Sequence, residues 1–199
     1  SGCLIKINDK NAMQPEMLFS SPLHKITDFP FSILGGFAVL RNRYLVGGYE
    51  EKLFVWDIEN NKEIGTHFFQ QYRYLLFGIN AVTEKYLIGV GVESNCEYSH
   101  VVRFKIDDLL QCEKKPEIEI LKKYRSLDVK QSLVSLPNNQ VVMSFSNSTE
   151  IEVWDVETKK EISRLKANGR VNYTTPLSNQ YFASYSRIER GTDMMELWE

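Results

Sequence analysis

Hydrophobic and polar positions alternate along this chain in short β-type runs that recur at a nearly constant interval. Each recurrence ends on an aromatic or apolar anchor, and two of the anchors are followed at once by aspartate, Asp57 and Asp155. In chain order the anchors are Ile5, Trp56, Phe104, Trp154 and Trp198, which subtraction places 51, 48, 50 and 44 residues apart. A fixed interval of this size predicts an architecture of repeated supersecondary units.

A second motif keeps step with the anchors, which supports a true repeat. Each copy has three apolar residues followed by Gly or Ser, and each copy follows a polar pair. The copies are residues 44–49, 86–91, 141–146 and 181–186. Two coupled short motifs are far more specific than either alone. We therefore expect the second strand of every repeat to lie at these positions.

The spacing of β-type runs and turn residues predicts four strands in each repeat. The expected strands are 34–40, 44–49, 52–57 and 63–69; then 75–82, 86–92, 99–106 and 117–121; then 129–136, 141–146, 150–155 and 160–165; and finally 171–177, 181–186 and 194–198. Two further strands are expected at 3–7 and 16–20, with a helical turn at 108–111. No outer strand is expected for the last repeat.

The runs that are expected to form the innermost strand of each repeat carry few charges, whereas residues 150–154 alternate polar and apolar. Strands buried on both faces and strands that are half exposed have these two patterns. The prediction is an all-β fold, a β-propeller of four-stranded antiparallel blades, with about four blades plus a half in this chain. The expected blades are 3–20 (partial), 33–69, 74–122, 127–166 and 170–199.

The ends of the chain raise the question of how the ring closes. Ser1-Gly2 is expected to be a remnant of tag removal, so that residues 3–199 form the single propeller domain or fragment. An unclosed propeller exposes the apolar faces of both end blades. A ring of five blades, further blades in a longer parent protein, or self-association through the unclosed end blades would each cover them.

These motifs resemble the WD-repeat β-propeller family over nearly all of residues 3–199. Residues 53–63 and 151–161 are similar to that family's third strand, its Trp-Asp ending and the turn that follows. The chain departs from the family because no Gly-His pair precedes an inner strand and the repeats exceed the usual 40–45 residues. The family's buried network would survive only in part, through Ser144 with Trp154 and Ser184 with Trp198. A Kelch-type propeller is the alternative, because Gly47-Gly48 forms a double glycine.

Composition narrows the range of partners. The 199 residues are 43% apolar and 25% charged, with a net charge of −2 and a pI near 6.0. This balance argues against nucleic acid or an anionic membrane as a partner, since both need a basic face. No apolar run reaches the roughly 18 residues of a membrane span. Cys3, Cys96 and Cys112 show no CxxC spacing, so we expect no disulfide and a cytoplasmic or nuclear location.

The sequence offers little sign of catalysis. Three scattered histidines give no metal-ligand spacing, and there is no glycine-rich phosphate loop or nucleophile elbow. The acidic pairs Glu50-Glu51 and Asp107-Asp108 are read as solvated turn residues. We therefore predict that the protein is not an enzyme and needs no cofactor or metal. A propeller hydrolase or lyase with carboxylates in its central channel is the alternative.

One set of residues suggests a binding site. In WD-repeat propellers, the loops that enter each first strand and those between second and third strands line one rim. The rim candidates here are Arg73, Tyr74, Tyr124, Arg125, Arg170, Tyr173, Arg187 and Arg190. Converging guanidinium groups with neighbouring tyrosines suit an acidic or phosphorylated peptide. The expected function is a non-catalytic protein–protein interaction platform within a larger regulatory or scaffold protein.

Overall fold

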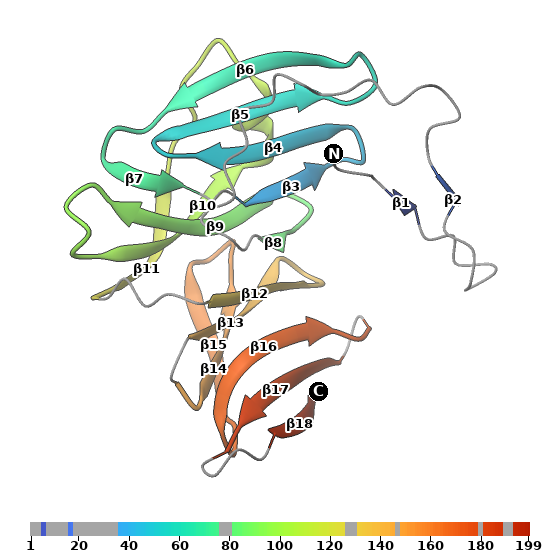
Figure 1. The fold of residues 1–199 in the computed structure, drawn as a ribbon, viewed down its shortest axis with the longest axis vertical. Helices are drawn as coiled ribbons and strands as arrows, with labels where there is room; N and C mark the ends of the chain where they lie inside the picture. The colour runs from blue at the N-terminus through green and yellow to red at the C-terminus, as the bar shows by residue number, and fades with distance from the viewer. Residues whose placement is uncertain are drawn as a thin grey trace. The chain divides into compact units, whose positions relative to one another are not determined.

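The structure is a computed structural model that describes residues 5–6, 16–17, 36–75, 81–125, 131–145, 148–178, 181–188 and 193–199. The chain divides into two compact units, Ser1–Pro30 and Phe31–Glu199. In the first unit β1 (Ile5–Lys6) pairs antiparallel with β2 (Glu16–Met17), within the two segments where the sequence predicts strands. The second unit carries the blades (Figure 1).

The described part of the second unit forms four antiparallel sheets, here numbered blades 1 to 4 in chain order. Blade 1 is β3 (Phe37–Leu40), β4 (Tyr44–Tyr49), β5 (Lys52–Asp57) and β6 (Lys62–Phe68). Blade 2 is β7 (Tyr72–Leu75), β8 (Ala81–Val82), β9 (Tyr86–Glu93), β10 (Ser99–Lys105) and β11 (Glu119–Tyr124). Blade 3 is β12 (Gln131–Leu136), β13 (Gln140–Phe145), β14 (Glu150–Asp155) and β15 (Lys160–Lys166). Blade 4 is β16 (Arg170–Pro176), β17 (Phe182–Arg187) and β18 (Asp193–Trp198).

Most predicted strands are confirmed, and blade 2 holds the main differences. Its inner strand, predicted over 75–82, is two short strands, β7 and β8, that both pair with β9; residues 76–80 lie outside the described residues. The outer strand is Glu119–Tyr124, so it begins two residues and ends three residues later than the predicted 117–121. The expected helical turn is α1 (Ile106–Leu110), which starts two residues earlier.

Each pair of successive blades shares its own hydrophobic cluster. Phe104 of blade 2 is buried among residues of blades 1 and 2, and Trp154 of blade 3 is buried among residues of blades 2 and 3. Trp198 of blade 4 packs against the cluster between blades 3 and 4. The anchors therefore point back toward the preceding blade, which confirms that aromatic rings fill the spaces between blades. Trp56 belongs to the first described blade and is only half-buried, whereas Trp154 is 9% exposed.

The aspartates that follow the tryptophans close the turn into the outer strand. Asp57 accepts hydrogen bonds from the backbone N–H groups of Glu59 and Asn60 at 3.0 and 3.2 Å, and from Arg43 at 2.7 Å. Asp155 likewise accepts from the N–H groups two and three residues ahead, at 2.8 and 3.0 Å. The Arg43 hydrogen bond holds the pKa of Asp57 well below its usual value. These residues have the structural role that the motif predicts.

The expected tryptophan–serine pairs differ between blades. Trp198 Nε1 donates to Ser184 Oγ at 2.8 Å, as predicted. The pairing of Ser144 with Trp154 is wrong, since Trp154 Nε1 donates to Glu152 Oε2 at 2.9 Å. The reason is register: Leu45 lies opposite Trp56 and Phe182 opposite Trp198, but the partner of Trp154 is Val141.

The pairing of Val141 with Trp154 shows that the motif copy at residues 141–146 is displaced by one position relative to the copies in the other second strands. Successive residues of a strand point to opposite faces, so a shift of one residue moves every side chain to the other face. Val141 and Met143 therefore pack with Trp154 against blade 2, while Val142 packs in the cluster beside blade 4. Ser144 lies on the same face as Val142, away from the tryptophan.

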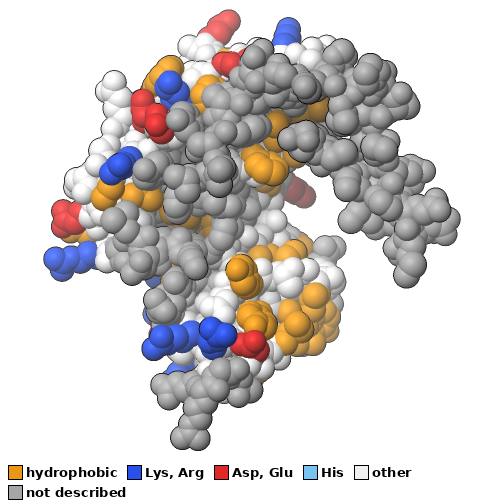
Figure 2. Space-filling model, viewed as in Figure 1, with side chains coloured by type: hydrophobic (Ala, Val, Ile, Leu, Met, Phe, Trp, Pro, Cys, Tyr) orange, Lys and Arg blue, Asp and Glu red, His pale blue; other side chains and the backbone are white. Residues whose placement is uncertain are grey.

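Blade 4 has three strands among the described residues, so β18 forms its edge, as the sequence predicts. Phe182 and Trp198 pack toward blade 3, and the alternate residues lie on the opposite face, which we call the outer face of blade 4. Met195 and Leu197 on this face are 75% and 65% exposed. Figure 2 shows hydrophobic side chains gathered over β16 to β18. Blade 4 thus presents an uncovered apolar face.

The structure also bears on disulfides, membrane-spanning helices and metal sites. Cys96 and Cys112 are free thiols, in loops on opposite ends of blade 2. The described residues contain no helix with the length and apolar character needed to cross a membrane. Within the same ranges no group of three or more His, Cys, Asp or Glu side chains is arranged to hold a metal ion.

Candidate functional site

One end of the blades, here called the rim end, has the β4–β5, β6–β7, β9–β10, β15–β16 and β17–β18 connections, and the described rim arginines lie at this end. Arg73 is the second residue of β7, Arg125 follows β11, Arg170 begins β16 and Arg187 ends β17. Arg190 and the side chain of Tyr74 lie outside the described residues. The structure brings together only part of the set, on blade 4.

Arg170 and Arg187 are direct partners across β16 and β17. Both are exposed, and like charges placed opposite one another on neighbouring strands are destabilising. Arg187 Nε lies 3.6 Å from Asp193 Oδ1, and Arg170 has no ion pair among the described residues. Among the described residues at this end of blade 4, one carboxylate therefore lies near two guanidinium groups, an excess of positive charge.

The turn before β16 holds Arg170 in this position. A Cβ on Gly169 would lie 2.8 Å from the carbonyl oxygen of Arg187, so only glycine lets the turn approach the end of β17 this closely. The next-door Asn168 donates its side-chain amide to Glu196 Oε1 at 2.7 Å. Ser186 Oγ donates to the other oxygen of Glu196 at 3.3 Å. The arginine pair is thus presented by an ordered backbone.

Aromatic and apolar residues continue the outer face of blade 4 beyond the arginine pair. Tyr173 and Tyr185 are also register partners, with ring centroids 6.5 Å apart. A hydrogen bond to Asp193 raises the pKa of the Tyr185 phenol. Met195 lies opposite Tyr185 on β18, and Leu197 lies opposite Ala183 farther along, so the face changes along the strands from basic to aromatic to apolar. We call Arg170, Arg187, Tyr173, Tyr185 and Met195 the blade 4 surface.

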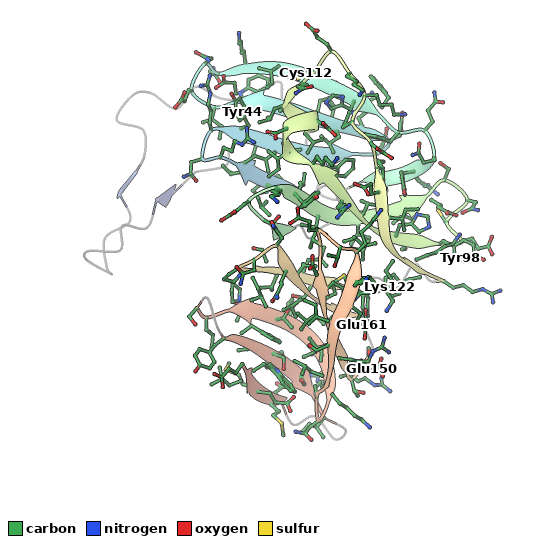
Figure 3. All side chains as sticks on the ribbon, turned by 180° about the vertical axis from the view of Figure 1, so that it is seen from behind. Tyr44, Tyr98, Cys112, Lys122, Glu150 and Glu161 are labelled. Atoms are coloured by element: carbon green, nitrogen blue, oxygen red, sulfur yellow. The ribbon has the colours of Figure 1, made fainter. Side chains whose placement is uncertain are left out.

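The other predicted rim residues lie elsewhere. Arg73 lines a surface hollow together with Glu50 and Glu51 of blade 1. Tyr124 packs on Phe145 at 4.1 Å between blades 2 and 3, and burial raises the pKa of its phenol. The ammonium group of Lys122 lies over both of these rings and over Trp154, at 5.3, 5.9 and 5.6 Å. Lys122 is labelled in Figure 3. Tyr124 is therefore part of an interface between blades.

Sequence reasoning missed Tyr185 and Met195 of the blade 4 surface, although a signal for them exists. Residues 182–187 and 193–198 alternate in strand fashion, and alternation places Tyr185 on the same face as Arg187. Pairing these positions with Tyr173 required the register of β16 against β17, which contains an irregularity between Val171 and Tyr173.

Comparison with known proteins gives the fold. No protein-family profile matches the chain, and no curated protein matches its sequence. Solved structures do match: the U3-55K protein and the WD40 repeats of RRP9, each with a TM-score of 0.50 and 11% identity. The hydrazine synthase of Kuenenia stuttgartiensis matches with a TM-score of 0.53 and 11% identity.

The chain has a β-propeller fold. The alignments cover 81%, 82% and 78% of this chain in the order U3-55K, RRP9 and hydrazine synthase, but only 54%, 54% and 42% of the matched chains. The chain thus spans about half the length of the structures that it resembles. At 11% identity the likeness concerns the fold, and the binding partner must be argued from this chain's own residues.

Proposed function

We propose that this chain is a non-catalytic protein-interaction domain that binds an acidic or phosphorylated peptide at the rim end of blade 4. The observation that carries the proposal is the direct pairing of Arg170 with Arg187 beside the Tyr173–Tyr185 pair. Guanidinium groups bind carboxylates and phosphates through two parallel hydrogen bonds. Exposed tyrosines add contact area at little cost in side-chain entropy.

The apolar end of the surface supports a peptide ligand over a small anion. Met195 and Leu197 are highly exposed; Met195 lies beside Tyr185 on the outer face, and Leu197 lies beyond the tyrosines, opposite Ala183. A peptide with an acidic end and an apolar end would meet the basic and apolar ends of this face in one orientation. Free thiols at Cys96 and Cys112 are consistent with a reducing location, the cytoplasm or nucleus.

Charge reversal at Arg170 and Arg187 tests the proposal. We expect the variant Arg170→Glu/Arg187→Glu to bind an array of Glu-rich and phosphoserine peptides at least about tenfold more weakly, because the two charges lost are the anion contacts. Fluorescence polarisation of the best array peptides measures the loss. The matched control is Lys105→Glu/Lys114→Glu, which reverses two exposed charges at the opposite end of blade 2. Equal binding by wild type and the Arg170→Glu/Arg187→Glu variant would rule out this site.

We also propose that the chain self-associates through its end blades. β18 is the edge of blade 4, and its unpaired backbone could pair antiparallel with β18 of a second copy across a two-fold axis. Met195 and Leu197 of the two copies would then lie side by side on the outer face of the joined sheet.

The oligomeric state tests this self-association. We expect Leu197→Lys to shift the protein from dimer to monomer by light scattering after size-exclusion chromatography, because a lysine on an edge strand opposes edge-to-edge pairing. Ile162→Lys, at an apolar position of the outer strand β15 that is 51% exposed, is the control and should leave the mass unchanged. A wild-type chain that is monomeric at high micromolar concentration contradicts the proposal.

A further inference from the structure

A second candidate site lies at the rim end between blades 1 and 2, away from the blade 4 surface. Two adjoining hollows of about 340 and 500 Å³ share Gln70, Tyr72 and Ser94 in their walls. Glu50, Glu51 and Arg73 line the first hollow only, while His100 and Ile120 line the second only. Because the two hollows share these lining residues, we treat them together and call them the rim groove.

Backbone hydrogen bonds hold the walls of the rim groove in place. Phe69 N donates to the carbonyl oxygen of Glu51 at 2.7 Å, which ties the turn after β6 to the β4–β5 turn. Ser94 N donates to Gln71 O at 3.1 Å, and Ser94 Oγ donates to Gln70 O at 2.8 Å. Because these contacts link three rim connections, the groove is formed before any ligand arrives, which lowers the entropy cost of binding.

His100 gives the groove a polar group that the fold does not use. The residue is 4% exposed, and its Nδ1 lies 3.1 Å from the hydroxyl of Tyr72. Burial raises the pKa of Tyr72 to about 12 and lowers that of His100. The phenol therefore keeps its proton and the ring is neutral. In the tautomer in which the phenol donates to Nδ1, the ring hydrogen is on Nε2.

Nε2 of His100 has no hydrogen-bond partner among the described residues. Glu93 Oε1 lies 3.1 Å away, a distance that qualifies as an ion pair with a charged imidazole, but the contact does not have hydrogen-bond geometry. A buried polar group without a partner is costly, and in native structures such groups are rare. Nε2 is buried beside Glu93 in the lining of the second hollow, where a ligand oxygen that displaces the Glu93 carboxylate would accept a hydrogen bond from it.

The charges and the apolar wall define what that ligand is. Glu50 and Glu51 have no ion pair among the described residues, and Glu93 lies 3.6 Å from Lys123. The lining thus has three carboxylates and one guanidinium group, that of Arg73. Ile120 is 47% exposed and forms an apolar wall in the second hollow. The side-chain amides of Gln70 and Gln71 can bind the main chain of an extended peptide.

We propose that the rim groove binds an extended peptide segment in which a lysine or arginine side chain is next to an aliphatic one. The cationic side chain lies in the first hollow against Glu50 and Glu51. The aliphatic side chain lies on Ile120 in the second hollow, and a peptide carbonyl accepts the hydrogen bond of His100 Nε2. This site has the opposite charge preference to the blade 4 surface and does not depend on it.

Selection from a phage-displayed library of random dodecapeptides on the whole chain tests the proposal. We expect the enriched peptides to share an arginine or lysine beside Ile, Leu or Val. The best of these, made with a fluorescein label, should bind at least tenfold more weakly to Glu50→Lys/Glu51→Lys. It should keep its affinity for Arg170→Glu/Arg187→Glu, which separates this site from the proposed function, and for Glu113→Lys/Glu117→Lys, which reverses two exposed carboxylates at the opposite end of blade 2.

Substitution of His100 tests the floor of the groove. His100→Leu should weaken the same peptide about tenfold, and His100→Gln, whose amide can donate from nearly the same place, should restore most of the affinity. Ile120→Ser at an exposed position provides a variant whose fold is not at risk, and it should also weaken binding. An enriched motif without a cation, no enrichment at all, or affinity unchanged by Glu50→Lys/Glu51→Lys would overturn the proposal.

Discussion

Replacing Trp154 with alanine should lower the free energy of unfolding by about 3–5 kcal/mol, the cost of removing a large buried aromatic side chain from a core. The ring lies in the cluster between blades 2 and 3 and is 9% exposed. Its Nε1 also donates to the buried carboxylate of Glu152, so the substitution leaves that group short of a donor. Urea unfolding followed by circular dichroism measures the loss.

Trp56→Ala is the matched control, because the equivalent ring of blade 1 is only half-buried. We expect a loss of about 1–2 kcal/mol there, in proportion to the smaller apolar area that the ring removes from water. The stability loss for Trp154→Phe should lie between those of Trp56→Ala and Trp154→Ala, since phenylalanine keeps an aromatic ring but cannot donate the hydrogen bond. Equal losses of unfolding free energy for Trp56→Ala and Trp154→Ala would contradict the expectation that burial between blades makes Trp154 the more stabilising residue.

Replacing Arg103 with alanine should cost a similar amount, about 3–5 kcal/mol, because removal of one partner of a buried charged network leaves the others unsatisfied. Arg103 is 5% exposed and donates to the carbonyl oxygens of Val156 and Glu157, the latter at 3.0 Å. Its second nitrogen donates to Glu119 Oε2 at 2.8 Å. The side chain thus joins the outer strand of blade 2 to a turn of blade 3. Lys105→Ala, at an exposed position of the same strand, should change stability by less than about 0.5 kcal/mol.

The difference between wild type and Arg103→Ala should depend on pH. The Arg103 hydrogen bond, with a second one from Lys159, lowers the pKa of Glu119 from 4.5 to about 2. A carboxyl whose pKa is lower in the folded state adds stability above its unfolded pKa and loses it as the pH falls toward the folded value. The difference in unfolding free energy between wild type and Arg103→Ala should therefore have its full size above pH 4.5 and decrease between about pH 4.5 and 2. A gap of constant size across this range would contradict the role given to Glu119.

The candidate site was predictable in its residue types and only partly in its arrangement. Arg170, Tyr173 and Arg187 follow from the loop positions of a propeller and do lie together. Tyr124 has the same sequence context but packs inward on Phe145, because the end of β11 is covered by blade 3. The rim groove has no sequence signal at all, since its walls come from three connections that meet only when blades 1 and 2 pack.

The sequence by itself determined the strands, the turns closed by Asp57 and Asp155, and the count of three strands in blade 4. These depend on residues close in the chain, where alternation and turn chemistry act directly. Only the tertiary structure decided the shifted register of β13, the role of Arg103 and the unpaired N–H of His100. Each of these depends on which side chains of neighbouring strands and blades come into contact, and no local pattern encodes that choice.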